Sequence, residues 1–162
     1  MITAARLAGF FAAHAVWCVS DGSPLVPMLA YTTADDERKL ERMAHDDPGA
    51  AVTYGRERLR ENEMDATDAV LLYDGRITME KGKMDAVLVE MRAWFSPDSE
   101  AVLAIPYTPK EAGGFLVHKP KVLTWKNCDD FELKSVVQAF FEGVDEHEEG
   151  SKVWNACLDQ SK

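Results

Sequence analysis

Residues 85–107 read DAVLVEMRAWFSPDSEAVLAIPY, and this stretch decides the fold. Successive side chains of a strand point to opposite faces, so alternate positions share one face. One such set is entirely apolar and predicts the core-facing side of a strand: Val87, Val89, Met91, Ala93 and Phe95. Ser96-Pro97-Asp98 favours a turn, and residues 100–107 resume a strand pattern in which both faces look partly covered. The stretch therefore predicts two consecutive strands joined by a short turn.

Further strands are predicted on both sides of this pair. Asp74-Gly75 supplies the backbone angles of a two-residue hairpin turn, which would join residues 69–73 to 76–79. A second turn is expected at residues 80–83, and short strands at 115–118 and 122–125. No helical pattern interrupts these segments. We therefore expect a single, mostly antiparallel meander sheet of about five or six strands.

Helical patterns lie before and after the predicted sheet. Helices are expected at residues 3–19, 33–43, 47–61, 131–142 and 145–158. Asp47-Pro48 is the start signal of the third helix, an Asp129/Glu132 capping box is the start signal of the fourth, and Gly143 is the stop signal of the fourth. A strand at 25–32 separates the first two. The order of helices, strands and helices predicts an α+β fold, with the N-terminal and C-terminal helices packed on the sheet. No linker or repeat divides the chain, so residues 1–162 are expected to form one domain.

The charge of the chain restricts its partners. It carries 28 acidic and 18 basic residues, a formal net charge of −10, and has no basic stripe. Nucleic-acid binding is therefore disfavoured, because a phosphate backbone repels such a surface. Residues 129–149 hold eight carboxylates and one lysine, Lys134. This run is interpreted as a solvated helical face, or alternatively as an acidic surface for a basic partner.

Cysteine usage and hydropathy predict a cytoplasmic protein. Cys18, Cys128 and Cys157 are odd in number and widely spaced, which is typical of free thiols in a reducing compartment. The apolar stretch 7–19 is shorter than the roughly 18 residues that a membrane-spanning helix needs. Its helical spacing favours a packed amphipathic helix over a signal peptide.

Tests for catalytic and metal-binding motifs give only weak leads. The histidines stand at 14, 45, 118 and 147, without HxH or HxxxH spacing, so no metal and no cofactor is expected. His14 and Cys18, four residues apart on a helix, could bring an imidazole beside a thiol. His45-Asp46-Asp47 resembles a metal-binding doublet but precedes a helix start. For both leads the structural explanation is favoured.

The second face of the 85–95 strand is the first place to look for a pocket. It contains Glu90, Arg92 and Trp94, and Tyr107 or His118 could lie nearby. These types of side chain can line a polar groove, although a Glu-Arg pair beside an aromatic ring can equally sit on a half-solvated sheet surface.

Two functions follow as hypotheses. The leading one is a non-enzymatic protein-interaction domain, adaptor-like or immunity-like, acting on a protein partner or as a homodimer. The alternative is a small-molecule-binding protein or a hydrolase that uses the face around Glu90, Arg92 and Trp94.

Overall fold

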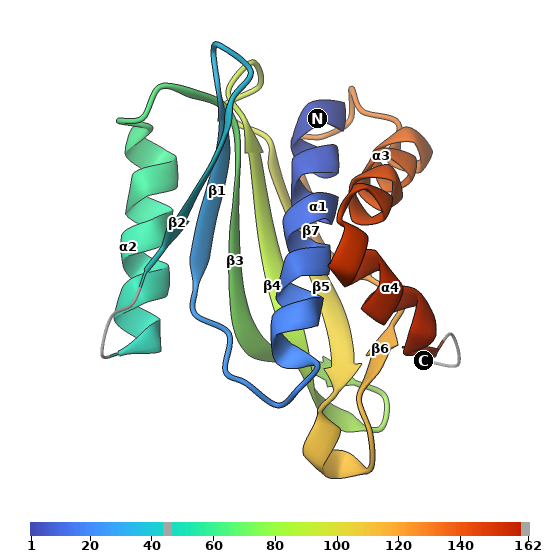
Figure 1. The fold of residues 1–162 in the computed structure, drawn as a ribbon. Coiled ribbons are helices and arrows are strands. Elements are labelled where there is room, and N and C mark those ends of the chain that lie inside the picture. Colours follow the sequence, from blue (N-terminus) through green and yellow to red (C-terminus); the bar gives the residue numbers. More distant parts are fainter. Residues whose placement is uncertain (44–46, 160–162) are drawn as a thin grey trace.

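The computed structural model describes residues 1–43 and 47–159. This part of the chain forms an α+β fold of four α-helices, eight strands and one short 3-10 turn (Figure 1). In chain order the elements are α1 (Ile2–Val19), β1 (Met28–Thr33), β2 (Arg38–Arg42), α2 (Pro48–Glu61), β3 (Ala66–Met79), β4 (Gly82–Ala93), β5 (Glu100–Thr108), η1 (Lys110–Ala112), β6 (Leu116–His118), β7 (Lys121–Lys126), α3 (Leu133–Glu146), α4 (Glu148–Ala156) and β8 (Leu158–Asp159).

The strands form one sheet in the order β2-β1-β3-β4-β5-β6-β8. β7 also pairs with β5, so β6 and β7 follow one edge of β5 in succession. Every pairing is antiparallel except β6 with β8, which is parallel. The predicted α+β class and mostly antiparallel sheet are thus confirmed. The sheet is larger than the predicted five or six strands: β1 corresponds to the predicted strand at 25–32, whereas β2 at one edge and the two-residue β8 at the other were not predicted.

The predicted helix 33–43 is wrong, because this segment forms the β1–β2 hairpin. Asp36 N–H donates to Thr33 O over 3.0 Å, and Glu37 N–H donates to Thr33 Oγ1 over 3.2 Å. Asp36 has a φ of 63°, in the left-handed region that aspartate tolerates in turns. Thr33 and Asp36 therefore belong to a tight turn and not to the start of a helix.

The predicted turn at Asp74-Gly75 is also wrong, since both residues lie inside the long strand β3. β3 pairs with β4 in continuous register from Asp68↔Ala93 to Met79↔Gly82, and the chain turns only beyond Met79. A Cβ on Gly75 would lie 2.8 Å from Leu88 Cδ2, so glycine here makes room for packing. Asp74 Oδ1 accepts a hydrogen bond from Tyr107 Oη over 2.7 Å. These tertiary contacts override the local turn preference.

The predicted inward face of β4 is confirmed for its strand portion. Val87, Val89, Met91 and Ala93 are buried in the main core against α1. Phe95 is the exception at 69% exposure, because β4 ends at Ala93 and the ring instead meets Phe131 edge to face.

α1 packs on the sheet at β3 and β4 and lies beside the C-terminal helices α3 and α4 (Figure 1). Its closeness to α3 depends on glycine: a Cβ on Gly9 would stand 1.8 Å from Phe140 O, and one on Gly143 would stand 2.0 Å from Arg6 O. Ile2–Val19 is long and apolar enough to cross a membrane by length and composition, but 61% of that window is buried inside the fold. A mostly buried core helix and a signal sequence near the N-terminus both have this character.

The bounds of α3 and α4 differ from the prediction, whereas α2 begins as predicted. Asp47 caps α2 as predicted, since Gly49 N–H donates to its Oδ1 over 3.0 Å. The Asp129/Glu132 capping box is wrong, because Glu132 is the N-cap of α3 and makes no side-chain cap bond. α3 also does not stop at Gly143, which packs on the α1 backbone. The predicted helix 145–158 is shorter, because α4 begins after His147.

Candidate functional site

Glu90 lies on the sheet face away from α1, where α2 supplies its partner. Arg56 Nη2–H donates to Glu90 Oε2 over 2.9 Å, and its Nε lies 3.2 Å from Oε1. Tyr73 Oη–H donates to the same Oε2 over 2.6 Å. Burial and this bond to Glu90 raise the pKa of Tyr73 to about 12. The carboxylate is therefore already engaged by an arginine and a phenol.

Glu90, Arg92 and Trp94 share the face that the alternation predicts, but each has separate contacts. Arg92 Nη2 lies 3.7 Å from Glu100 Oε1, and Trp94 packs against the smaller core cluster that includes Leu29. Glu90, Arg92 and Trp94 therefore contact three different parts of the fold.

Tyr107 and His118 lie elsewhere. Tyr107 faces the α1 side of the sheet and bonds to Asp74, and burial raises the pKa of its hydroxyl. His118 is fully buried on β6, with Nε2 3.0 Å from Thr108 Oγ1. The structure thus keeps the five predicted groove residues in three places.

The His14 and Cys18 pair has the wrong electrostatics for a nucleophile. Burial raises the pKa of the Cys18 thiol and lowers the pKa of His14. A reactive cysteine requires a lowered thiol pKa. His14 Nδ1 lies instead 3.2 Å from His147 Nε2.

The described residues do not bring together a set of side chains that could bind a metal ion. These contain no group of three or more His, Cys, Asp or Glu side chains that could hold a metal ion. Of the His45-Asp46-Asp47 doublet, His45 and Asp46 lie outside the described residues, and Asp47 caps α2.

The acidic run 129–149 is partly paired. Arg6 Nη2–H donates to Glu142 Oε2 over 2.6 Å, and Arg38 Nη2–H donates to Glu146 Oε2 over 3.1 Å. These exposed contacts connect α3 to α1 and to β2. Glu142 and Glu146 of the acidic run are therefore paired within the fold.

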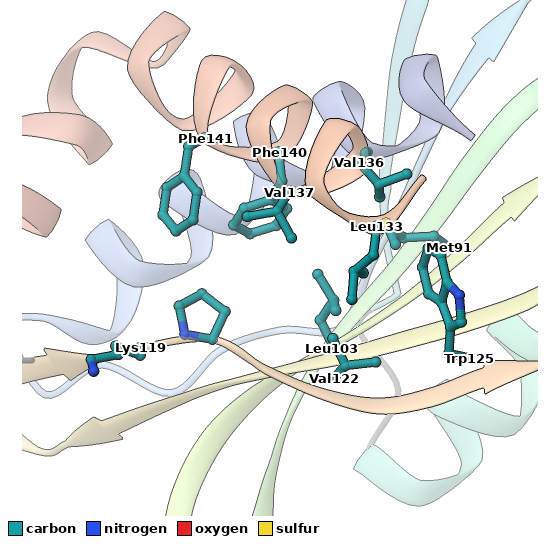
Figure 2. Close-up of a pocket in the computed structure, with 12 residues that line it drawn as sticks. Met91, Leu103, Lys119, Val122, Trp125, Leu133, Val136, Val137, Phe140 and Phe141 are labelled. Atoms are coloured by element: carbon teal, nitrogen blue, oxygen red, sulfur yellow. The ribbon is translucent and has the colours of Figure 1, made fainter. Parts of the chain in front are cut away.

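A different surface feature is an apolar groove between α3 and β7 (Figure 2). Its cavity measures about 250 Å³. Nearly all of its lining is apolar, and Lys119 stands at one end (Figure 2). The α3 side is formed by Leu133, Val136, Val137, Phe140 and Phe141, and the β7 side by Val122 and Trp125.

β7 is the edge of the sheet beside this groove. It pairs with β5, and none of the described strands pairs with its other side. Val122 and Trp125 stand opposite Leu103 and Ala101, whose side chains belong to the main core, so both point toward α3. The register shifts after Val102, which leaves Leu123 as an extra residue on β7.

Apolar side chains remain exposed along both walls of the groove. Val122 is 42% exposed on β7, and Leu133 and Val137 are 44% and 41% exposed on α3. An exposed apolar patch beside an open strand edge is a recurrent form of protein-interaction surface.

The sequence contained a signal for this surface. Leu133, Val137 and Phe141 recur at every fourth position and form a second apolar stripe beside Val136 and Phe140. One stripe packs on α1 and the sheet, and the second lies at the groove. Helical spacing alone does not separate the two, because together they form one wide apolar face.

Comparisons with family models, with curated proteins and with solved structures gave no match to this chain. The groove, the strand edge and the surrounding charge are therefore the features that bear on function.

Proposed function

We propose that this protein is a non-enzymatic interaction module that binds an extended segment of a partner protein along β7. The observation that carries the proposal is the outer side of β7, with which none of the described strands pairs, directly beside the apolar groove. The leading interpretation of the sequence, an adaptor-like or immunity-like domain, belongs to this class.

Strand addition uses both features of the surface. The backbone N–H and C=O groups of an edge strand can bond to an added strand, and pockets for alternate side chains then select the partner. The cavity of about 250 Å³ exceeds the roughly 150 Å³ cavity that accommodates benzene. It can therefore receive one aromatic or large aliphatic side chain of the added segment.

Charge selects the kind of segment. Lys119 precedes β7 and Lys126 is its last residue, in a chain whose formal net charge is −10. A bound segment with carboxylates near its ends would meet these ammonium groups, whereas a basic segment would be repelled. The proposed occupant is therefore an extended segment with a large apolar residue at its centre and acidic residues at its flanks.

A second copy of this chain fits the edge less well. In the antiparallel pairing that matches all six residues of β7 with another β7, Lys121 would stand opposite Lys126 at both ends. Like charges directly opposite each other destabilise strand pairing. This repulsion favours a heterologous acidic partner over the homodimer, which stays an outcome of the test.

Two further expectations belong to this proposal. Cytoplasmic residence is supported by the three cysteines, none of which is in a disulfide in the described chain. The alternative site around Glu90 has less support, because Arg56 and Tyr73 already occupy its carboxylate.

Selection from a displayed library of random peptides tests the proposal. Enriched peptides should combine acidic flanks with a central large apolar residue. Affinity is then measured for wild type, for Val137→Glu in the groove and for Leu40→Glu on the opposite sheet edge. The valine and the leucine are similarly exposed, at 41% and 37%, so they form a matched pair.

We expect Val137→Glu to weaken binding at least tenfold, about 1.4 kcal/mol, and Leu40→Glu to leave it unchanged. Peptides that bind both variants equally, or a library without enrichment, would refute the proposal. Light scattering gives the remaining outcome: a dimer that dissociates in Val137→Glu would show that a second copy occupies the edge.

A further inference from the structure

A second cavity, unrelated to the groove, lies where α1 meets the segment leading into β1 and the end of β2. It measures about 410 Å³. Trp17, Val26 and Met28 form apolar parts of its wall, and Trp17 and Val26 are 42% and 39% exposed. His14 and Arg42 contribute nitrogen atoms to the polar part of the wall.

The hydrogen position on His147 is fixed by its role as a helix cap. Gly150 N–H donates to His147 Nδ1 over 2.9 Å at the start of α4. Nδ1 is therefore an acceptor, and the neutral ring carries its hydrogen on Nε2. Burial lowers the pKa of His147 and so favours this neutral form.

That hydrogen determines the state of His14 in turn. His147 Nε2 lies 3.2 Å from His14 Nδ1, so the His147 N–H donates and His14 Nδ1 accepts. Burial lowers the pKa of His14 as well, and a neutral His14 must then carry its hydrogen on Nε2. The outer nitrogen of His14 is thus a donor.

The outer nitrogen of His14 lies 3.3 Å from Arg42 Nη2. A guanidinium nitrogen has no acceptor site, so this contact brings two N–H donors together instead of forming a hydrogen bond. Arg42 also has no carboxylate ion-pair partner among residues 1–43 and 47–159. The pair requires an acceptor that both donors can share.

We propose that this cavity binds a small carboxylate with an apolar body. One carboxylate accepts from His14 Nε2–H and from the Arg42 guanidinium, whose positive charge favours an anion over water. The apolar body lies against Trp17 and Val26. The proposal is independent of the one for β7.

Cys18, Asp21 and Glu149 are the other titratable groups near the pair, and they differ in charge and position. On α1, burial raises the pKa of Cys18, which keeps its thiol neutral. Asp21 also lines the cavity, and hydrogen bonds from Ser23, one of them from its N–H to Asp21 Oδ1 over 2.9 Å, lower the pKa of Asp21 and keep it charged. The attraction of the Arg42 guanidinium must therefore exceed the repulsion between Asp21 and the bound carboxylate. On α4, Glu149 acts electrostatically on His147 and does not line the cavity.

Titration with phenylacetate tests the proposal, with phenylacetamide as the neutral analogue and inorganic phosphate as an anion without an apolar body. Binding is followed by the NMR signals of the Trp17 indole and the His14 imidazole. Arg42→Gln removes one donor. Arg76→Gln is the matched control, because Arg76 is an exposed arginine of β3 that pairs with Asp85 and does not line the cavity.

We expect phenylacetate to give saturable shifts, at least tenfold weaker in Arg42→Gln and unchanged in Arg76→Gln. It should also raise the pKa of His14 in the wild type, a readout that needs no variant, while phenylacetamide should not. Equal binding of the amide, an unaffected Arg42→Gln protein, or no saturable shift would overturn the proposal. Phosphate binding as tight as that of phenylacetate would refute the role of the apolar wall.

Discussion

Replacing Gly9 by alanine should separate the two helices that depend on it. The added Cβ would stand 1.8 Å from Phe140 O, whereas real Cβ contacts are essentially never under 3.0 Å, so α1 and α3 must move apart by at least 1.2 Å. The obstacle is backbone, which cannot rotate away as a flexible side chain does. Overpacking of a core costs about 1–3 kcal/mol, and a rigid obstacle places Gly9→Ala at the upper end.

The assay is thermal and urea unfolding of Gly9→Ala beside Gly49→Ala. The loss of about 3 kcal/mol corresponds to a Tm lowered by roughly 6–12 °C for a chain of this size. In the control the nearest atom to the new Cβ is Asp47 Oδ1 at 3.4 Å, an ordinary contact. Gly49→Ala should therefore be neutral or stabilising by up to about 1 kcal/mol, from helix propensity.

The double variant Gly9→Ala/Gly143→Ala tests whether both glycines are required by the same contact between α1 and α3. Gly143→Ala forces the same two helices apart, since its Cβ would lie 2.0 Å from Arg6 O. Once the helices have separated, the second substitution meets less resistance, so Gly9→Ala/Gly143→Ala should cost less than the sum of the single changes. If Gly9→Ala costs less than about 1 kcal/mol, or if the two costs are additive, the close helix contact is not what requires glycine.

Three further outcomes follow from the titratable groups. Burial lowers the pKa values of His14 and His147, so the unfolded chain binds more protons, and the free energy of unfolding should fall as the pH drops below about 6.5. Urea unfolding across that pH should show a smaller fall in His147→Asn, which keeps a good N-cap residue; an unchanged fall would contradict the assignment. Tyr73→Phe should lose about 1–2 kcal/mol with the hydrogen bond to Glu90, and the tyrosinate titration should lose a group with a pKa of about 12; retention of that group would show it is another tyrosine. The raised pKa of Cys18 predicts alkylation by iodoacetamide much slower in the native protein than in urea, and equal rates measured by mass spectrometry would refute it.

The sequence predicted features whose cause is local. The Asp47-Pro48 cap needs only its own helix turn, and the inward face of β4 follows from the alternation of Val87, Val89 and Met91. Both predictions are confirmed, because neighbouring residues are enough to determine them.

The features that it missed depend on distant partners. Gly75 lies within β3 because it pairs with β4 and packs against Leu88. Gly143 lies within α3, where it packs against the backbone of α1. Residues 38–42 have no apolar alternation of their own and become a strand by pairing with β1. Tertiary contacts therefore override local preference at all three places.

The candidate sites divide in the same way. Alternation placed Glu90, Arg92 and Trp94 on one face, but could not show that Arg56 of α2 closes over Glu90. One wall of the groove could have been predicted from the second apolar stripe of α3. The open edge at the other wall could not, because it depends on the lack of a described strand on the outer side of β7. The contact of His14 with Arg42 joins residues 28 positions apart and has no sequence signal.

The position of α1 has a consequence for biosynthesis. This helix leaves the ribosome before the rest of the described chain, yet Arg6 and its partner Glu142 are 136 positions apart. Until α3 has been translated, the apolar flank that receives it stays uncovered, and a nascent chain in that condition is a substrate for chaperones and prone to aggregate. Stop codons that truncate the protein before residue 133 should therefore yield insoluble product rather than a smaller folded unit.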